Sequence, residues 1–292
     1  MSILLLLPFL FFRAFAQSSP AEEHDPETPL KIEHAEPLYI DLIRDLGARK
    51  GEKEWNVGMG LTDKLAFDQY LLLVEYEWAP IDRLGLEVEV PVTIFSSNAP
   101  GFTDVPRPSD RVESIKTALQ WTFLVTGRHQ TSLALGFINE LEFTDLNTLS
   151  ANRIFRGNVY NPFFVAAKRW PHHFHTLLYT GPLIEHRFGE KQLHTLLEVN
   201  TNLHYMLPGT RNFVGLEVNK TLEKGNFDMV LRPQIRVSLM DNLLVGLVTG
   251  IPVSKQNERL SSFVRLIYEP GHTHLALPSL RPRIYNRSRN PK

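Results

Sequence analysis

Hydrophobic and polar side chains alternate one by one along most of this chain, and a period of two is typical of β-strands with one apolar face. In the clearest run, residues 84–94, every even-numbered position is leucine, valine or isoleucine. The positions between them are Gly85, Glu87, Glu89, Pro91 and Thr93. A tilted strand needs about 9–11 residues to cross the hydrocarbon core of a membrane. The run therefore predicts a membrane-crossing strand.

The same alternation recurs often enough to predict twelve strands. They span residues 55–61, 72–78, 84–94, 115–125, 131–143, 162–170, 174–188, 195–205, 213–220, 227–238, 243–252 and 260–269. An even number is usual for bacterial outer-membrane barrels. The predicted fold class is all-β, a closed antiparallel transmembrane β-barrel. A soluble β-sandwich would also alternate, but its strands would more often have about five or six residues.

The connections between the predicted strands support the barrel. When a barrel is entered from the periplasm, long loops follow odd strands and tight turns follow even ones. The two longest connections, residues 95–114 and 144–161, both follow odd strands. Aromatic residues gather near strand ends, where the two membrane interfaces are expected. They are Trp55, Trp78, Phe143, Trp170, Phe188, Tyr205 and Tyr268.

The N-terminal 16 residues predict a cleaved signal peptide. An apolar run at residues 3–12 precedes Ala14, Phe15 and Ala16, which match a small-x-small cleavage pattern. The run is too short to cross about 30 Å of hydrocarbon as a helix. We therefore expect export, followed by a periplasmic leader at residues 17–53.

A short amphipathic helix is predicted inside the leader, at residues 37–46. Leu38, Leu42 and Leu46 have fourfold spacing, with Pro37 at the start and Gly47 past the end. Two placements stay open: the helix docks on the barrel rim or membrane interface, or it plugs the lumen. The barrel is assigned to residues 54–270, and a basic tail to residues 271–292.

Composition limits the classes of function. The chain has 31 Lys and Arg against 32 Asp and Glu, a formal net charge of −1. It therefore lacks the dense basic character that a nucleic-acid partner requires. It has no cysteine, so disulfides, thiolate metal sites and a lipoprotein anchor are excluded.

Ionisable residues occupy the predicted inward faces, with acids mostly on early strands and bases mostly on late strands. The lumen-facing candidates are Glu75, Glu77, Glu87, Glu89, Lys116, Glu140, Glu142, Glu198, Glu217, Arg232, Arg236 and Arg265. In one interpretation, salt bridges among them fill a narrow lumen. In the other, they set up a transverse field that orients a polar solute.

No motif predicts an enzyme or a cofactor. The sequence has neither a Gly-x-Ser-x-Gly elbow nor a phosphate-binding glycine-rich loop. Barrel lipases use a Ser–His pair, and no serine lies next to a histidine in an alternating strand. His172, His173 and His175, and separately His272 and His274, lack the neighbouring acids and spacing of a zinc or copper site.

Residues 34–41 read His-Ala-Glu-Pro-Leu-Tyr-Ile-Asp, and residues 42–56 continue as Leu-Ile-Arg-Asp-Leu-Gly-Ala-Arg-Lys-Gly-Glu-Lys-Glu-Trp-Asn. This segment resembles the motif that names the HAEPLYID family of bacterial proteins. Residues 84–91 and 266–269 are more loosely similar to outer-membrane proteins grouped with phenol meta-pathway transporters. The resemblance implies a barrel and passage of small molecules, and it implies no catalytic residues.

These patterns predict a channel or transporter-like barrel for small solutes in the bacterial outer membrane. Its expected partners are outer-membrane lipid, a small solute and, during insertion, the barrel-assembly machinery. Two alternatives stay open: a closed structural or partner-binding barrel, and an outer-membrane lipid hydrolase.

Overall fold

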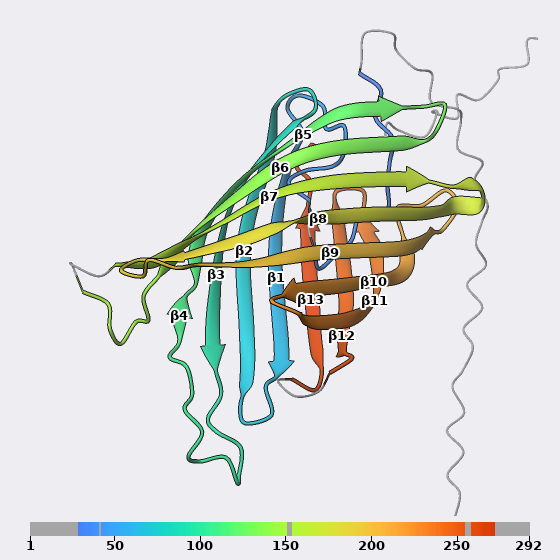
Figure 1. The fold of residues 1–292 in the computed structure, drawn as a ribbon. Helices are drawn as coiled ribbons and strands as arrows, with labels where there is room; N and C mark the ends of the chain where they lie inside the picture. The colour runs from blue at the N-terminus through green and yellow to red at the C-terminus, as the bar shows by residue number, and fades with distance from the viewer. Residues whose placement is uncertain (1–28, 41, 151–153, 255–257, 272–292) are drawn as a thin grey trace, which may run out of the picture.

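The structure is a computed structural model, and it describes residues 29–40, 42–150, 154–254 and 258–271. In these ranges the chain forms a closed antiparallel β-barrel of 12 strands (Figure 1). The predicted signal peptide, and the predicted tail beyond residue 271, lie outside the described residues. No helix of these described ranges has the length and hydrophobicity needed to cross a membrane.

The strands follow the alternation of the sequence. They are β1 (Lys53–Asp63), β2 (Asp68–Ile81), β3 (Leu84–Phe95), β4 (Arg111–Val112), β5 (Ser114–Thr126), β6 (Thr131–Phe143), β7 (Phe155–Arg169), β8 (Phe174–Arg187), β9 (Leu193–Met206), β10 (Phe213–Glu223), β11 (Asn226–Met240), β12 (Leu243–Pro252) and β13 (Ser261–Tyr268). β4 and β5 both pair with β3 and are separated only by Glu113, so they act as one strand of the wall. The prediction of 12 strands is confirmed.

The barrel closes where the first strand pairs with the last. β1 and β13 run antiparallel from Trp55 opposite Tyr268 to Thr62 opposite Ser261. Every strand therefore has a partner on each side, and no backbone edge is left for lipid to face.

The connections largely follow the predicted parity. The longest ones, after β3 and after β6, lie at the end of the barrel opposite the turns at residues 82–83, 127–130 and 241–242. Two connections on the long-loop side are short, because residues 64–67 join β1 to β2 and only Lys224 and Gly225 join β10 to β11. Both residues have positive φ, 46° and 89°, as two-residue hairpin turns require.

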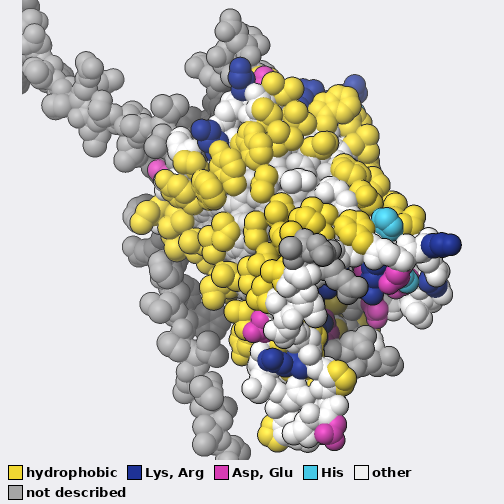
Figure 2. All heavy atoms as spheres, turned by 90° about the vertical axis from the view of Figure 1, so that its left-hand side faces the viewer, with side chains coloured by type: hydrophobic (Ala, Val, Ile, Leu, Met, Phe, Trp, Pro, Cys, Tyr) yellow, Lys and Arg dark blue, Asp and Glu magenta, His cyan; other side chains and the backbone are white. Residues whose placement is uncertain are grey.

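The two faces of the wall differ in chemistry. β13 alternates strictly between buried and exposed residues, and large apolar side chains such as Met59, Trp121 and Leu247 are exposed on the outside. Figure 2 shows hydrophobic side chains covering much of the outer face. An apolar belt of this extent suits contact with lipid.

The hydrophobic core lies inside the barrel, and residues preceding β1 supply part of it. Leu42, Ile43 and Leu46 pack in one cluster with wall residues that include Phe163 and Val165. Ala35 and Leu38 belong to a second cluster, together with Phe213, Leu244 and Phe263 on the wall.

The helix predicted at residues 37–46 is wrong, because the described residues there form bends and turns. Arg44 has φ of 79° and Gly47 has φ of 84°, values that an α-helix cannot contain. The Arg44 N–H donates to the Leu42 carbonyl at 2.8 Å, two residues back instead of four. The fourfold leucine spacing reflects packing against the wall.

The lipid-facing belt gives a first prediction. Leu119 lies near the middle of β5 and is exposed on the outside. We expect Leu119→Arg to destabilise the barrel in phosphatidylcholine vesicles by about 2–4 kcal/mol, because a charge would face hydrocarbon. Guanidinium titration of folding into the vesicles measures the change. Leu146→Arg, in an exposed connection, is the control, and equal stability of the two variants would contradict the belt.

Candidate functional site

The described residues between positions 30 and 50, here called the lumen plug, thread through the barrel interior (Figure 1). Their hydrogen bonds reach strands around the whole circumference. The wall residues in contact are Glu54 on β1, Glu77 on β2, Gln120 and Thr122 on β5, Ser132 on β6, His175 on β8, His204 on β9, Glu217 on β10 and Gln234 on β11. Of the two placements left open by the sequence, the structure has the segment inside the lumen.

Wall side chains bind the backbone of the lumen plug directly. The Leu38 N–H donates to Oε1 of Gln234 at 2.8 Å, and the Gly47 N–H donates to Oγ1 of Thr122 at 3.0 Å. Nε2 of Gln120 donates to the Arg44 carbonyl at 2.8 Å. Because the plug contains no helix or strand, these bonds replace the pairing that regular structure would provide.

Two wall glycines allow the lumen plug to approach closely. A Cβ atom at Gly85 on β3 would lie 1.8 Å from the Ile43 carbonyl oxygen. A Cβ atom at Gly246 on β12 would lie 2.6 Å from a methyl carbon of Leu38. The first contact is with backbone, which cannot rotate away, so only glycine fits at position 85 while the plug is docked.

Arg44 is the charged centre of the lumen plug and is 4% exposed. Its guanidinium forms an ion pair with Glu54, and lies 3.4 Å from Oε2 of Glu77 and 3.2 Å from Oδ2 of Asp45. Burial alone would raise the pKa of Asp45, but the charges of Arg44 and Lys31 outweigh burial and hold that pKa well below its usual range. Asp45 therefore remains an anion.

A cluster of buried acids lies on β2 and β3 beside Arg44. Glu75, Glu77 and Glu87 place one carboxylate oxygen each within 4.8 Å of one another, a spacing that could hold a metal ion. Two cations already lie against them: Nζ of Lys116 is 3.0 Å from Glu87, and Arg265 is 3.6 Å from Glu75. With Arg44 also present, these contacts are those of an ion-pair network.

Four further acids among the lumen candidates have wall residues as neighbours. Glu89 forms an ion pair with Lys116, and the charge of Lys116 also acts on Glu140. Glu198 accepts a hydrogen bond from Asn161 at 3.3 Å, and Glu142 pairs with Arg156 at 2.8 Å.

Glu217 and the two late-strand arginines bind polar and aromatic groups. Glu217 accepts from the Ile40 N–H at 3.1 Å, while the Arg232 guanidinium lies 3.3 Å from the ring centre of Tyr39. Arg236 donates to the Arg211 carbonyl at 3.2 Å. Arg265 and Lys116 thus contact acids of the wall directly, whereas Glu217 and Arg232 contact the lumen plug. These groups do not face each other across an open lumen.

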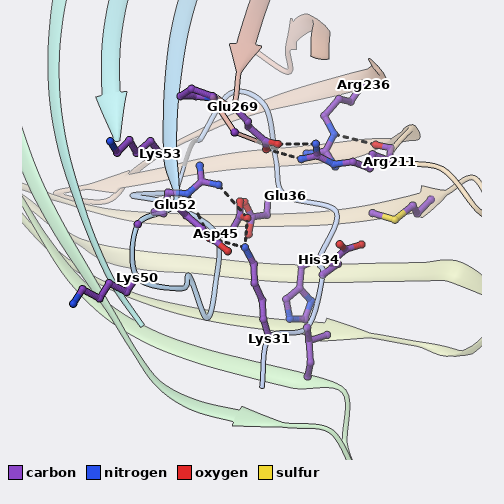
Figure 3. Close-up of a pocket in the computed structure, with 17 residues that line it drawn as sticks. Lys31, His34, Glu36, Asp45, Lys50, Glu52, Lys53, Arg211, Arg236 and Glu269 are labelled. Carbon is purple, nitrogen blue, oxygen red and sulfur yellow. Dashed lines mark hydrogen bonds and ion pairs between the residues drawn. The ribbon is translucent and has the colours of Figure 1, made fainter. Parts of the chain in front are cut away.

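A pocket of about 370 Å³ opens at the turn end of the barrel, between the lumen plug and the wall. Figure 3 shows Lys31 extended toward Asp45 and Glu52, with contacts of 2.6 and 2.7 Å. Arg211 forms a bidentate pair with Glu269 nearby, at 2.7 and 2.5 Å. The Lys31 contacts tie the start of the plug to its end and to Glu52, just before β1, whereas the Arg211 pair joins two connections of the wall.

One Ser–His contact, which the sequence reasoning missed, is present in the lumen. Nε2 of His34 lies 2.9 Å from Oγ of Ser132 on β6. Ser132 is fully buried, and Nδ1 of His34 has no hydrogen-bond partner among the described residues. A hydrolytic triad would place an acid at that nitrogen and expose the serine to substrate, so this geometry is that of an anchor for the plug.

The fold, the apolar belt and the plugged lumen define the class of the protein: a β-barrel of the outer-membrane type. A family model described as HAEPLYID-like matches residues 30–269. The chain therefore belongs to the HAEPLYID-like family, as its sequence motif indicated. The match begins at the lumen plug and includes every strand. No curated protein matches the chain.

Solved structures of outer-membrane channels have a similar fold. The COG4313 outer membrane channel from Pseudomonas putida F1 aligns with a TM-score of 0.62 at 8% identity, covering 79% of this chain and 99% of that one. The KdgM porin aligns with a TM-score of 0.50 at 12% identity, covering 74% of this chain and 98% of that one. At these identities the likeness concerns the fold alone.

The Arg44 contacts give a second prediction. We expect Arg44→Met to weaken docking of the lumen plug by about 3–5 kcal/mol, because Glu54 and Glu77 would be left as buried charges without their partner. Hydrogen exchange of the plug amides in the full-length barrel measures this opening. Lys50→Met, at an exposed position, is the matched control. Equal protection in the two variants would show that Arg44 does not hold the plug.

Proposed function

We propose that this protein is a channel for small solutes in the bacterial outer membrane and that the lumen plug closes it. The observation that carries the proposal is the construction of the plug. It has no regular structure of its own, and side chains of the wall hold its backbone. A segment held in this way can leave without unfolding a strand of the barrel.

The chemistry of the inner wall supports passage of a polar solute. Acidic, basic and amide side chains line the lumen, including Glu140, Glu198 and Asn200 beyond the lumen plug. Withdrawal of the plug would leave a lumen lined by these groups, and lining of this kind selects solutes in porins. The exported, membrane-inserted location and the contact with lipid belong to the same proposal, supported by the apolar belt.

The runner-up is a permanently closed barrel with a structural or partner-binding role. The ion pairs of Arg44 and Lys31 favour it, because they make the closed form stable. The two proposals differ in one measurable respect, which is whether displacement of the lumen plug produces flux.

Gly85 offers the sharpest test, because a methyl group there would collide with the Ile43 carbonyl. We expect Gly85→Ala to displace the lumen plug and raise the single-channel conductance in planar bilayers about tenfold or more. Gly60→Ala is the matched control, since its Cβ atom would meet its nearest neighbour at 3.3 Å and touch no part of the plug.

The variant also needs evidence that the plug has moved. Proteolysis within residues 42–50, at sites protected in the parent protein, supplies it. A displaced plug without ion flux or small-solute flux would overturn the channel proposal and favour the closed barrel.

A further inference from the structure

Ala35, in the lumen plug, is held through both of its backbone polar groups by histidines of the wall. Its N–H donates to Nδ1 of His175 on β8 at 3.0 Å. Its carbonyl oxygen lies 2.9 Å from Nδ1 of His204 on β9 and must accept a hydrogen bond from it. Both imidazoles are buried, with 2% and 0% of their surface exposed. These bond directions determine which ring nitrogens carry hydrogen.

His204 can make its two contacts only as a neutral ring. Gln234 accepts the Leu38 N–H through Oε1, so its amide nitrogen Nε2 is the donor toward Nε2 of His204 at 3.0 Å. Nε2 of His204 must therefore accept, while Nδ1 donates to Ala35. A proton added at Nε2 would place two donors face to face and would disturb the amide that holds Leu38.

The same argument applies to His175 on the other side of Ala35. Because Nδ1 accepts the Ala35 N–H, it carries no hydrogen. Protonation would turn this acceptor into a donor directed at another donor. The hydrogen bond would be lost and a charge would be buried in its place.

The ring of His34, the neighbour of Ala35 in the plug, contacts the neutral hydroxyl of Ser132 and pairs with no carboxylate of the described residues. Its ring centre lies 6.3 Å from that of His175, edge to face. Nδ1 of His34 is buried without a hydrogen-bond partner among the described residues. Burial, with smaller contributions from His175 and Arg169, lowers the pKa of His34 to about 3. The docked plug therefore keeps this imidazole neutral.

The charged and titratable groups around the three imidazoles are mostly basic. Those facing them are Arg169 from β7, His173 from the turn before β8, Arg236 from β11, Asp45 from the plug, and Glu217 from β10, which reaches His204 only through Gln234. Asp45 acts on His34 and is already paired with Lys31 and Arg44. The surroundings therefore disfavour an added proton.

We propose that His34, His175 and His204 form an acid-sensitive lock that holds the lumen plug when neutral and releases it when protonated. This inference rests on the proposed channel function, and in it pH controls the opening of that channel. The docked state requires neutral rings, whereas hydrated rings take up protons below about pH 6.5. The plug is therefore fully retained above that pH. Below it, the equilibrium constant for docking of the plug falls by up to about tenfold per pH unit for each imidazole.

The test uses the full-length protein with two readouts. Since the chain has no cysteine, Glu33→Cys in the exposed part of the plug can carry a single fluorophore, whose collisional quenching reports release. Conductance in planar bilayers is recorded on the same protein. Between pH 7.5 and pH 4.5 we expect quenching and conductance to rise together, conductance by about tenfold or more.

Asparagine substitutions separate the histidines from the carboxylates, which also respond to acid. An asparagine amide can donate or accept near the Nδ1 position without titrating. We expect His175→Asn with His204→Asn to reduce the pH slope of release by about two protons, which leaves the response of His34 alone. We expect His173→Asn, on the exposed turn, to respond as the parent does. If the double variant is already open at pH 7.5, His175→Asn alone carries the test, and the expected result is a pH slope reduced by about one proton.

The outcomes distinguish the lock from the channel. A pH response unchanged in the asparagine variants would overturn the lock, as would no release down to pH 4.5 in a protein whose Gly85→Ala form conducts. Acid release reported by the fluorophore without any conductance would support the lock and overturn the channel.

Discussion

Backbone that is buried without helix or strand must have its N–H and C=O groups satisfied from elsewhere, and this requirement governs the interior of the barrel. The lumen plug brings such backbone into the space enclosed by the barrel wall. Polar side chains of the wall bond to these backbone groups: Gln234 accepts the Leu38 N–H, and Thr122 accepts the Gly47 N–H. The polar inner face therefore serves the plug as well as the lumen.

The same constraint explains why so much charge is buried in a protein of almost zero net charge. Once the lumen plug excludes water, Glu54 and Glu77 need a cation within the barrel, and Arg44 supplies it. Lys116 does the same for Glu87. Removal of the plug would return these groups to water, where each is stable alone, so the open and closed states are both chemically reasonable.

The sequence predicted the wall well because the wall obeys a local rule. Alternation identifies the strands, and a strand that keeps its apolar residues outside can have only one register. The lumen plug obeys no local rule. Leu38, Leu42 and Leu46 have helical spacing, yet their conformation is set by glycines and apolar side chains distant in the sequence. Gly246 lies more than 200 residues after Leu38, and no local pattern relates them.

The inner-wall residues divide in the same way. Alternation predicts which side chains point into the lumen. Their bonding partners depend on the lumen plug, part of which the sequence predicted to be a helix. The contact between His34 and Ser132 joins residues 98 positions apart. The alternation also gives no sign of Arg44, the cation that neutralises acids of β1 and β2, because Arg44 precedes the strands.

The pairing of β1 with β13 also constrains the order in which the parts of the molecule can fold. The lumen plug leaves the ribosome before the strands, yet the cavity it fills exists only after the C-terminal strand has paired with the first. Its contacts are thus among the latest to form, separated from their partners by long stretches of chain. Until then the acids of the inner wall face water. The plug can dock only in a closed barrel. An exposed N-terminal segment would therefore identify a sheet that has not yet closed.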